Sequence, residues 1–263
     1  MESKSRLTAL FERKKDSVLN IYCTAGFPKL ESTLEVMQSL ERNGADIIEL
    51  GMPYSDPLAD GPVIQQSGNT SLQNGMSIEK LFSQLDGFRS SISLPVILMG
   101  YLNPLLQFGF ERFCASAKHV GIDGLIIPDL PQPEFEREYK NMVKAAGLDF
   151  VFLVTPETSA ERIRALDASS TGFLYAVSSS SLTGSNKNFD DANAYLRRLK
   201  DMNLNNPVLV GFGVRDRPSF QSASKHVNGA IIGSAYIQAI ANASSVDDAT
   251  SVFLRSILNE NKE

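Results

Sequence analysis

The chain has 263 residues, of which 43% are hydrophobic and 21% are charged. These fractions are ordinary for a folded domain and exclude a disordered or collagen-like chain. The formal net charge of −5 argues against a general nucleic-acid-binding surface. No apolar run approaches the roughly 18 residues of a membrane span, and the first residues lack the apolar core of a signal peptide. With only 2 cysteines and no disulfide framework, we expect a cytoplasmic protein without membrane contact.

Short β-branched runs alternate with stretches of helical pattern along the whole chain. The runs expected to form strands are 18–24, 46–51, 95–100, 123–128, 149–154, 171–177, 207–213 and 229–233. Helices are expected between them, for example at 30–43, 77–88, 110–120 and 133–146, and an extra helix at 5–15 precedes the first strand. Several runs are apolar on both faces, which is typical of parallel strands covered by helices.

Alternating strands and helices predict either an α/β barrel or a doubly wound sheet. Eight units in a chain of 263 residues favour a (β/α)8 TIM barrel, and no linker or low-complexity break divides it. We therefore expect residues 1–263 to form a single barrel domain with an additional N-terminal helix.

Residues at the carboxyl ends of the strands carry the chemistry in such barrels. No lysine lies at these ends, which argues against a Schiff-base aldolase. His119 and His226 fall in helical patterns, so no histidine-rich metal site is expected. No Gly-x-Gly-x-x-Gly or Walker loop follows the first strand, which argues against a nucleotide-binding fold.

Two carboxylates near the second strand are candidates for acid–base chemistry. Glu49 interrupts an apolar strand, where burial would raise its pKa and suit it to proton transfer near neutral pH. Asp60 follows in a proline-rich loop and could be a second, positioned carboxylate. From the pattern alone, Glu49 could equally be a structural residue bonded to backbone amides, and Asp60 is better explained as a helix cap before Gly61 and Pro62.

A phosphate site is predicted from the glycines that follow the seventh and eighth strands. Gly213 and the pair Gly233–Ser234 lie in the two loops that often bind phosphate in barrels, and Gly184 could add a further amide. Aromatic and aliphatic residues would surround the barrel mouth and suit a flat apolar substrate with a phosphate tail. Those in the predicted pocket are Tyr22, Leu98, Tyr101, Ile127, Tyr175 and Phe212.

Long sequence motifs make the comparison with a known family specific. The segment 49–65 resembles the signature of the tryptophan synthase alpha subunit family, and further matching segments follow in family order at 98–104, 124–131, 182–184 and 211–214. The resemblance covers nearly the whole chain. It implies a (β/α)8 barrel that cleaves indole-3-glycerol phosphate to indole and glyceraldehyde 3-phosphate in tryptophan biosynthesis.

The resemblance also implies roles for individual residues. It places the family's catalytic carboxylates at Glu49 and Asp60, against the capping interpretation of Asp60. Thr183 corresponds to the lid residue that reaches the catalytic aspartate. The serines at 178–181 stand where the family often has an arginine and a glycine, and Tyr22 stands where phenylalanine is common. These departures predict a differently latched lid and slightly altered packing around indole.

A beta subunit is the implied partner. The resemblance predicts an α2β2 heterotetramer in which indole passes to a pyridoxal-phosphate-dependent beta subunit, while this chain needs no metal or organic cofactor. The expected docking rim on the catalytic face comprises Pro53, Asp56, Pro57, Asn103, Pro104 and Phe108. Two alternatives stay open: a free-standing indole-3-glycerol phosphate lyase, and a non-catalytic barrel that only activates a beta subunit.

Overall fold

The structure, a computed structural model, describes residues 5–177, 186–211 and 213–258, with the side chains of 186–192 outside that description. Its strands are β1 (Val18–Thr24), β2 (Ile47–Gly51), β3 (Val96–Met99), β4 (Gly124–Ile126), β5 (Asp149–Val151), β6 (Leu153–Val154), β7 (Leu174–Val177), β8 (Val208–Gly211) and β9 (Gly229–Ile232). They form one sheet in the order β5-β4-β3-β2-β1-β9-β8-β7-β6, in which every neighbouring pair is parallel.

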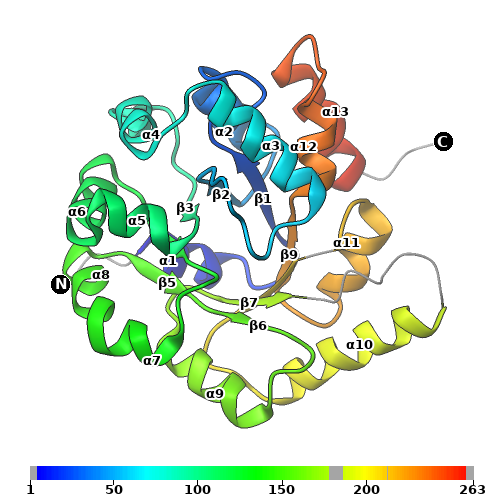
Figure 1. Ribbon diagram of the computed structural model, residues 1–263. Coiled ribbons are helices and arrows are strands. Elements are labelled where there is room, and N and C mark those ends of the chain that lie inside the picture. Colours follow the sequence, from blue (N-terminus) through cyan, green and yellow to red (C-terminus); the bar gives the residue numbers. More distant parts are fainter. Residues whose placement is uncertain (1–4, 178–185, 212, 259–263) are drawn as a thin grey trace.

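Helices surround this sheet, as Figure 1 shows. The α-helices are α1 (Arg6–Arg13), α2 (Ser32–Arg42), α3 (Pro62–Gln73), α4 (Ile78–Leu85), α5 (Leu102–Phe108), α6 (Phe110–Val120), α7 (Gln132–Glu134), α8 (Lys140–Ala146), α9 (Ala160–Ser169), α10 (Asn186–Asp201), α11 (Arg217–Ser224), α12 (Ser234–Ile240) and α13 (Val246–Leu258). A short 3-10 turn, η1 (Phe88–Ser90), follows α4, and a π-helical segment, η2 (Phe135–Tyr139), joins α7 to α8. None of the helices in the described ranges has both the length and the apolar composition that a membrane crossing requires.

The prediction of a (β/α)8 barrel is confirmed, with one change in the fifth strand. The expected strand at 149–154 is divided into β5 and β6, which are the two ends of the sheet order. Phe152 lies between them, and its carbonyl accepts a hydrogen bond from the backbone N–H of Tyr175 in β7 at 3.0 Å. A single residue thus connects β5 to β6, so the two ends of the sheet come together and the barrel is nearly closed.

Two apolar clusters lie on the two sides of the strands. The outer cluster joins the strands to the surrounding helices. The inner cluster fills the barrel, where Val18, Ile47 and Ile126 meet Leu7 and Leu10 of α1. The predicted N-terminal helix is therefore present, and it closes the end of the barrel at which the strands begin.

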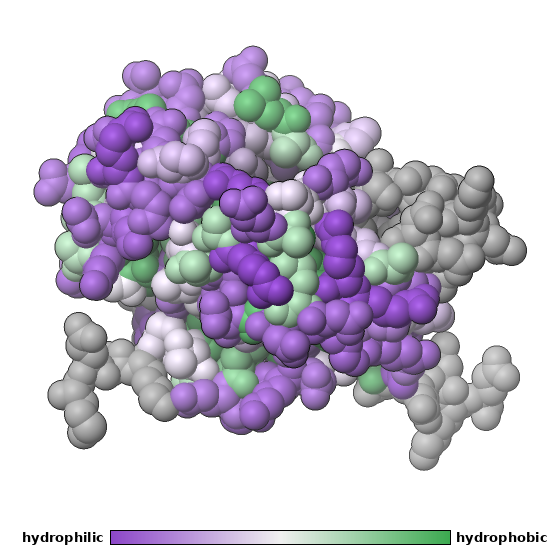
Figure 2. All heavy atoms as spheres, turned by 90° about the horizontal axis from the view of Figure 1, so that it is seen from below, coloured by the Kyte–Doolittle hydropathy of each residue, from purple (hydrophilic) through white to green (hydrophobic). Residues whose placement is uncertain are grey.

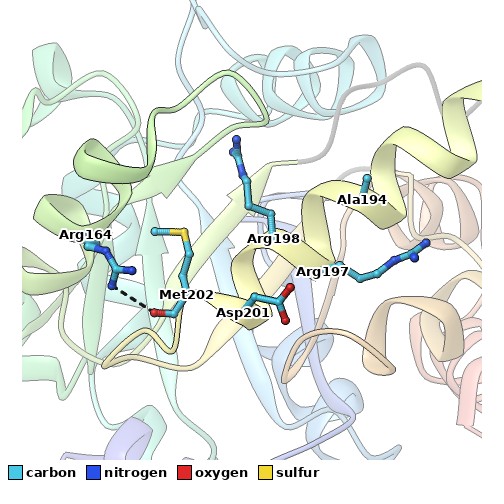
Figure 3. Close-up of a pocket in the computed structure, with 6 residues that line it drawn as sticks. All are labelled: Arg164, Ala194, Arg197, Arg198, Asp201 and Met202. Atoms are coloured by element: carbon cyan, nitrogen blue, oxygen red, sulfur yellow. Dashed lines mark hydrogen bonds between the residues drawn. The ribbon is translucent and has the colours of Figure 1, made fainter.

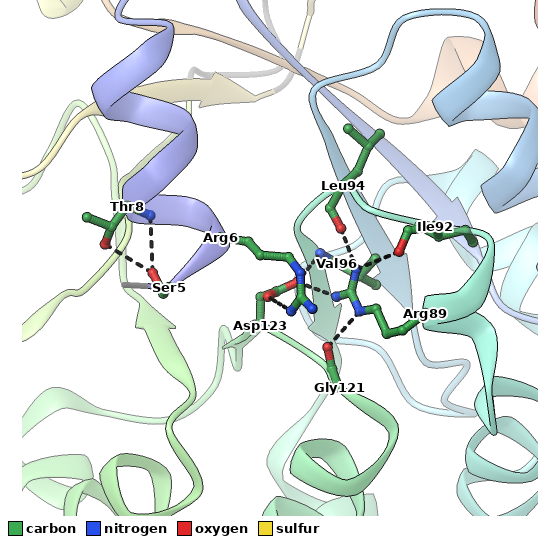
Figure 4. A network of polar contacts seen from close by, with 9 residues as sticks. All are labelled: Ser5, Arg6, Thr8, Arg89, Ile92, Leu94, Val96, Gly121 and Asp123. Carbon is green, nitrogen blue, oxygen red and sulfur yellow. Dashed lines mark hydrogen bonds and ion pairs between the residues drawn. The ribbon is translucent and has the colours of Figure 1, made fainter. Parts of the chain in front are cut away.

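An ion-pair network fastens α1 to this end of the barrel (Figure 4). Asp123, which precedes β4, accepts hydrogen bonds from Arg6 of α1 at 2.9 Å and from the N–H of Val96 at 2.7 Å. Arg89 of η1 also binds the Asp123 carboxylate, and it donates to the carbonyl of Gly121 at 2.9 Å. The Asp123 side chain is only 4% exposed, so its charge depends on these partners.

The outer surface seen in Figure 2 is mostly hydrophilic. Its apolar residues form small, separate areas among polar and charged ones. This face therefore offers no broad apolar surface among the residues that are coloured there.

Replacing Asp123 with alanine is expected to lower the free energy of unfolding by about 3–5 kcal/mol, since it leaves Arg89 without its buried counter-ion. Arg6→Ala should cost only about 1 kcal/mol, because the Arg6 side chain is 46% exposed. Urea denaturation measures both changes, with Asp16→Ala at an exposed position as the control. Equal losses for the Asp123 and Asp16 variants would contradict the importance of this network.

Candidate functional site

Glu49 lies inside the barrel, where β2 turns alternate residues to opposite faces. Ile47 and Glu49 point inward, whereas Ile48 and Leu50 belong to the outer cluster. Glu49 is 1% exposed, and its Oε2 accepts a hydrogen bond from Asn20 Nδ2 at 2.8 Å. Burial raises the pKa of Glu49 to about 8, despite the hydrogen bond from Asn20, which lowers it. The carboxyl is therefore mostly protonated at neutral pH.

Asp60 lies at the barrel mouth, in the loop that joins β2 to α3. The interpretation of Asp60 as a helix cap is wrong, because the N-cap position of α3 is occupied by Gly61 and no side chain caps this helix. The Asp60 side chain is hydrogen-bonded instead to the hydroxyl of Tyr101, which also accepts from the N–H of Ala59 at 3.0 Å. Burial raises the pKa of Asp60, and the bond from Tyr101 opposes that rise. The two carboxylates thus occupy different environments.

Glu49 and Asp60 line the same cavity, which has a volume of about 320 Å³. The cavity also brings together five other residues that the sequence predicted, namely Tyr22, Tyr175, Gly213, Gly233 and Ser234. Apolar and aromatic walls therefore meet glycine-rich loops and two carboxylates in one place, as the sequence analysis expected.

Two glycines make space for the tyrosine side chains. A Cβ atom at Gly51 would lie 2.0 Å from the hydroxyl oxygen of Tyr22, and one at Gly211 would lie 2.2 Å from that of Tyr175. Neither distance is physically possible without a rearrangement. Glycine at the ends of β2 and β8 is therefore required for both rings to lie inside the barrel.

Two of the predicted pocket residues face away from the cavity, toward the outside of the barrel. Leu98 and Ile127 belong to the outer cluster and pack against the helices. The cavity is lined by Met99, one position after Leu98, and Ile126 is the inward residue next to Ile127. Because side chains alternate along a strand, an error of one residue reverses the predicted face.

Some lining residues were not predicted, and some predicted ones cannot be placed. Arg215, Ile64 and Gln238 also line the cavity. The position of Arg215 two residues after Gly213 is a signal in the sequence for a positive charge near an anion, and among the described residues that line the cavity Arg215 is the only lysine or arginine. Three predicted residues, Thr183, Gly184 and Phe212, lie outside the described residues.

Comparison with known proteins supplies the family. The family model described as tryptophan synthase alpha chain matches residues 8–261. The chain belongs to this family.

Individual members of the tryptophan synthase alpha chain family match over almost their full length. The tryptophan synthase alpha chain of Parabacteroides distasonis is 46% identical over 254 residues, which cover 96% of this chain and 99% of the relative. The crystal structure of tryptophan synthase subunit alpha from Legionella pneumophila has a TM-score of 0.89 at 33% identity, with 97% of each chain covered. A crystal structure of the tryptophan synthase complex from Pyrococcus furiosus has a TM-score of 0.85 at 35% identity and covers 94% of this chain and 100% of that one.

In this alpha-chain family member, the residues of the predicted docking rim lie in two segments of the chain that a hydrogen bond joins. Pro53, Asp56 and Pro57 precede α3, and Asn103, Pro104 and Phe108 belong to α5. The two parts are joined by a hydrogen bond from Asn103 Nδ2 to the hydroxyl of Tyr54 at 3.2 Å. Leu58 and Leu106, which the sequence analysis did not select, expose 81% and 46% of their surface at this rim. Phe108 contributes less, because it is half-buried against Phe82 and Phe113.

A second hollow lies on the outside of the barrel, between α9 and the end of α10 (Figure 3). It has a volume of about 570 Å³ and includes Arg164, Arg197 and Arg198. Arg164 donates to the carbonyl of Met202 at 3.2 Å, and Arg198 to that of Pro156 at 3.0 Å. Neither candidate carboxylate lines this hollow, so the cavity at the barrel mouth is the candidate active site.

Burial of Glu49 is expected to make stability depend on pH. The folded pKa of about 8 lies above the ordinary value of 4.5, so stabilisation by the protonated carboxyl is complete below about pH 4.5 and is lost as pH rises through about 8. Glu49→Gln should flatten this fall in the free energy of unfolding, which amounts to a few kcal/mol. Urea denaturation across this pH range tests it, with exposed Glu157→Gln as the control. Parallel profiles for wild type and Glu49→Gln would count against a buried, protonated carboxyl.

Proposed function

We propose that this chain is a carbon–carbon lyase that cleaves indole-3-glycerol phosphate to indole and glyceraldehyde 3-phosphate. Membership of the family supports this reaction. The observation that carries the assignment of residues is the meeting of Glu49 and Asp60 in one cavity with different surroundings. Two carboxyl groups whose environments differ can divide the roles of acid and base.

Glu49 is the proposed proton shuttle. Because its pKa is about 8, it starts the reaction protonated and donates its proton to carbon 3 of the indole ring. The bond between that carbon and the glycerol side chain then breaks, and its electrons return to the ring. The resulting Glu49 carboxylate accepts the proton of the glycerol hydroxyl as the aldehyde forms. The carboxyl therefore ends the cycle protonated, as it began.

Asp60 is the proposed partner of the ring nitrogen. An ionised carboxylate there accepts a hydrogen bond from the indole N–H and stabilises the positive charge that develops after protonation of carbon 3. The hydroxyl of Tyr101 holds Asp60 and favours its ionised form. Tyr22 and Tyr175 line the same cavity as Glu49 and suit contact with a flat aromatic ring.

Phosphate binding is proposed for the loops after β8 and β9. Gly213, Gly233 and Ser234 line the cavity and offer backbone N–H groups, and Arg215 adds a positive charge in a chain whose net charge is −5. Thr183, Gly184 and Phe212 are proposed to complete the substrate site. Proton transfer by two carboxylates is sufficient for this cleavage, so we propose that pyridoxal phosphate serves only the beta subunit.

A beta subunit is proposed to dock on the rim beside the cavity and to receive indole there, in an α2β2 assembly. The structural similarity to a chain of the Pyrococcus furiosus tryptophan synthase complex supports such a partner. Among the described residues, Leu58 and Leu106 are two of the four large apolar side chains that are most exposed, and both lie at this rim. Apolar side chains next to stiff proline-containing loops suit a protein interface.

Glu49→Gln is expected to reduce the rate of indole release by at least about 100-fold, because general acid–base catalysis typically contributes 10²–10⁴-fold. The amide preserves shape but cannot transfer the proton. The assay follows indole formation from indole-3-glycerol phosphate by the isolated chain, with and without a beta subunit, and Glu157→Gln is the control. Retention of more than about a tenth of the wild-type rate would refute the proton-transfer role.

The same assay separates the alternative functions. A chain that turns over rapidly alone and does not respond to a beta subunit would be a free-standing lyase. An inactive wild-type chain that still binds and activates a beta subunit would be a non-catalytic activator.

Leu58→Ser is expected to weaken binding to a beta subunit by roughly tenfold, because fully burying a leucine is worth about 1.5–3 kcal/mol. Cleavage by the isolated chain should be unchanged, since Leu58 does not line the cavity. Val252→Ser is the matched control, because Val252 of α13 is 68% exposed but lies away from the rim. Titration calorimetry measures both affinities, and equal effects of the two substitutions would exclude this rim as the docking site.

A further inference from the structure

Asn20 is a polar residue in the apolar interior of the barrel. It lies on β1, where Val18 faces inward two positions earlier and Tyr22 lines the cavity two positions later. Its side chain is completely buried, and Nδ2 donates to Oε2 of Glu49 at 2.8 Å. In the register between β1 and β2, Tyr22 is opposite Glu49, so Asn20 approaches the carboxyl from one layer deeper in the barrel.

The amide of Asn20 is costly for stability. Its Oδ1 is buried and has no hydrogen-bond partner among the described residues. A buried carbonyl without a partner destabilises the folded state, because it has lost its hydrogen bonds to water and gained none in return. The surrounding layer is formed by apolar residues such as Val18 and Ile47, where an aliphatic side chain would pack without this penalty. Packing alone therefore does not explain an asparagine here, whereas contact with Glu49 does.

We propose that Asn20 is a positioning residue that serves both protonation states of Glu49. When the carboxyl is ionised, the NH2 group of Asn20 donates to it, as in the structure. When the carboxyl is protonated, a half-turn of the amide presents Oδ1, which accepts the carboxyl O–H. The half-turn breaks no other hydrogen bond of Oδ1, because none is present. This inference rests on the proposed role of Glu49 as the proton shuttle.

The acidic groups that face Glu49 do not favour its ionised form. They are Asp60 at the cavity, Tyr22 on β1 and Tyr175 on β7, whereas Cys23 of β1 belongs to the outer cluster. Burial raises the pKa of Glu49, and Asp60 adds to that rise. Asn20 acts in the opposite direction, because its donor stabilises the carboxylate. Without this donor, the pKa of Glu49 would rise further, and the protonated carboxyl would be a weaker acid that donates its proton to carbon 3 more slowly.

Asn20 should affect turnover more than substrate binding. It does not line the cavity and lies beneath the carboxyl that does. A change at Asn20 therefore leaves the walls of the pocket intact but alters the orientation and the proton affinity of Glu49.

The test is Asn20→Leu, which keeps a similar size and removes both the donor and the acceptor. The infrared band of the protonated Glu49 carboxyl, assigned by its loss in Glu49→Gln, is followed during a pH titration of the full chain. We expect its midpoint to rise by about one pH unit, because the hydrogen bond from Asn20 to the ionised carboxyl is stronger than the one to the protonated carboxyl, and Asn20→Leu removes both. We also expect kcat to fall at least about tenfold with KM nearly unchanged, and the melting temperature to stay equal or rise.

Two further variants make the outcome decisive. Ile47→Val alters the same buried layer, opposite Asn20 in the register, without touching the hydrogen bond, and should leave the titration midpoint and kcat as in wild type. Asn20→Ala provides the same measurement if the leucine variant does not fold. An unchanged infrared midpoint in both Asn20 variants, or a loss of stability without any change in midpoint, would overturn the proposal. Because the titration needs no turnover, its result stands apart from the activity of Glu49→Gln, which tests the proposed reaction itself.

Discussion

A carboxyl group held inside an apolar barrel is the feature on which the site depends. In water, a glutamate is ionised at neutral pH, but burial in the barrel raises the pKa of Glu49 to about 8. The same burial makes a carboxylate without a hydrogen-bond donor unfavourable. Asn20 supplies such a donor to Glu49 from within the barrel. The result is a group that can give up a proton and take one back within the range of ordinary pH.

Holding that carboxyl requires the rest of the barrel interior to be filled and fixed. Below it, α1 closes the barrel with Leu7 and Leu10, and Arg6 connects the helix to Asp123. Above it, Gly51 and Gly211 leave just enough space for two tyrosine rings to form walls. Apolar and aromatic side chains therefore surround Glu49 below and beside it, while the carboxyl faces the cavity. The end of the barrel that α1 closes and the end that holds the cavity are thus separate, as is general for this fold.

The mouth also connects the candidate active site to the candidate docking rim. Asp60 lies in the loop that carries Pro57 and Leu58, and Tyr101, which holds Asp60, directly precedes α5. The N–H of Ala59 donates to the same tyrosine hydroxyl. A partner that presses on this rim would act on the residues that position Asp60. Coupling between partner binding and cleavage therefore has a short physical path in this chain, through contacts made by one tyrosine.

The sequence by itself determined the order of the strands, the barrel, the helix that precedes it and the buried Glu49. These features depend on local patterns: β-branched runs, helical spacing and one charge in an apolar strand. Long family motifs added Asp60, which local pattern alone would have assigned to a helix cap.

Only the tertiary structure decided which residues meet. The break at Phe152, the inward position of Met99 in place of Leu98, and the bond between Asn20 and Glu49 each depend on how strands far apart in the sequence align. Arg215 reaches the cavity for the same reason, since the loop after β8 meets Glu49 of β2 at one cavity although β9 and β1 lie between these two strands in the sheet. A strand's sequence shows that its side chains alternate, but the register with its neighbours decides which face is inside and which polar group finds a partner.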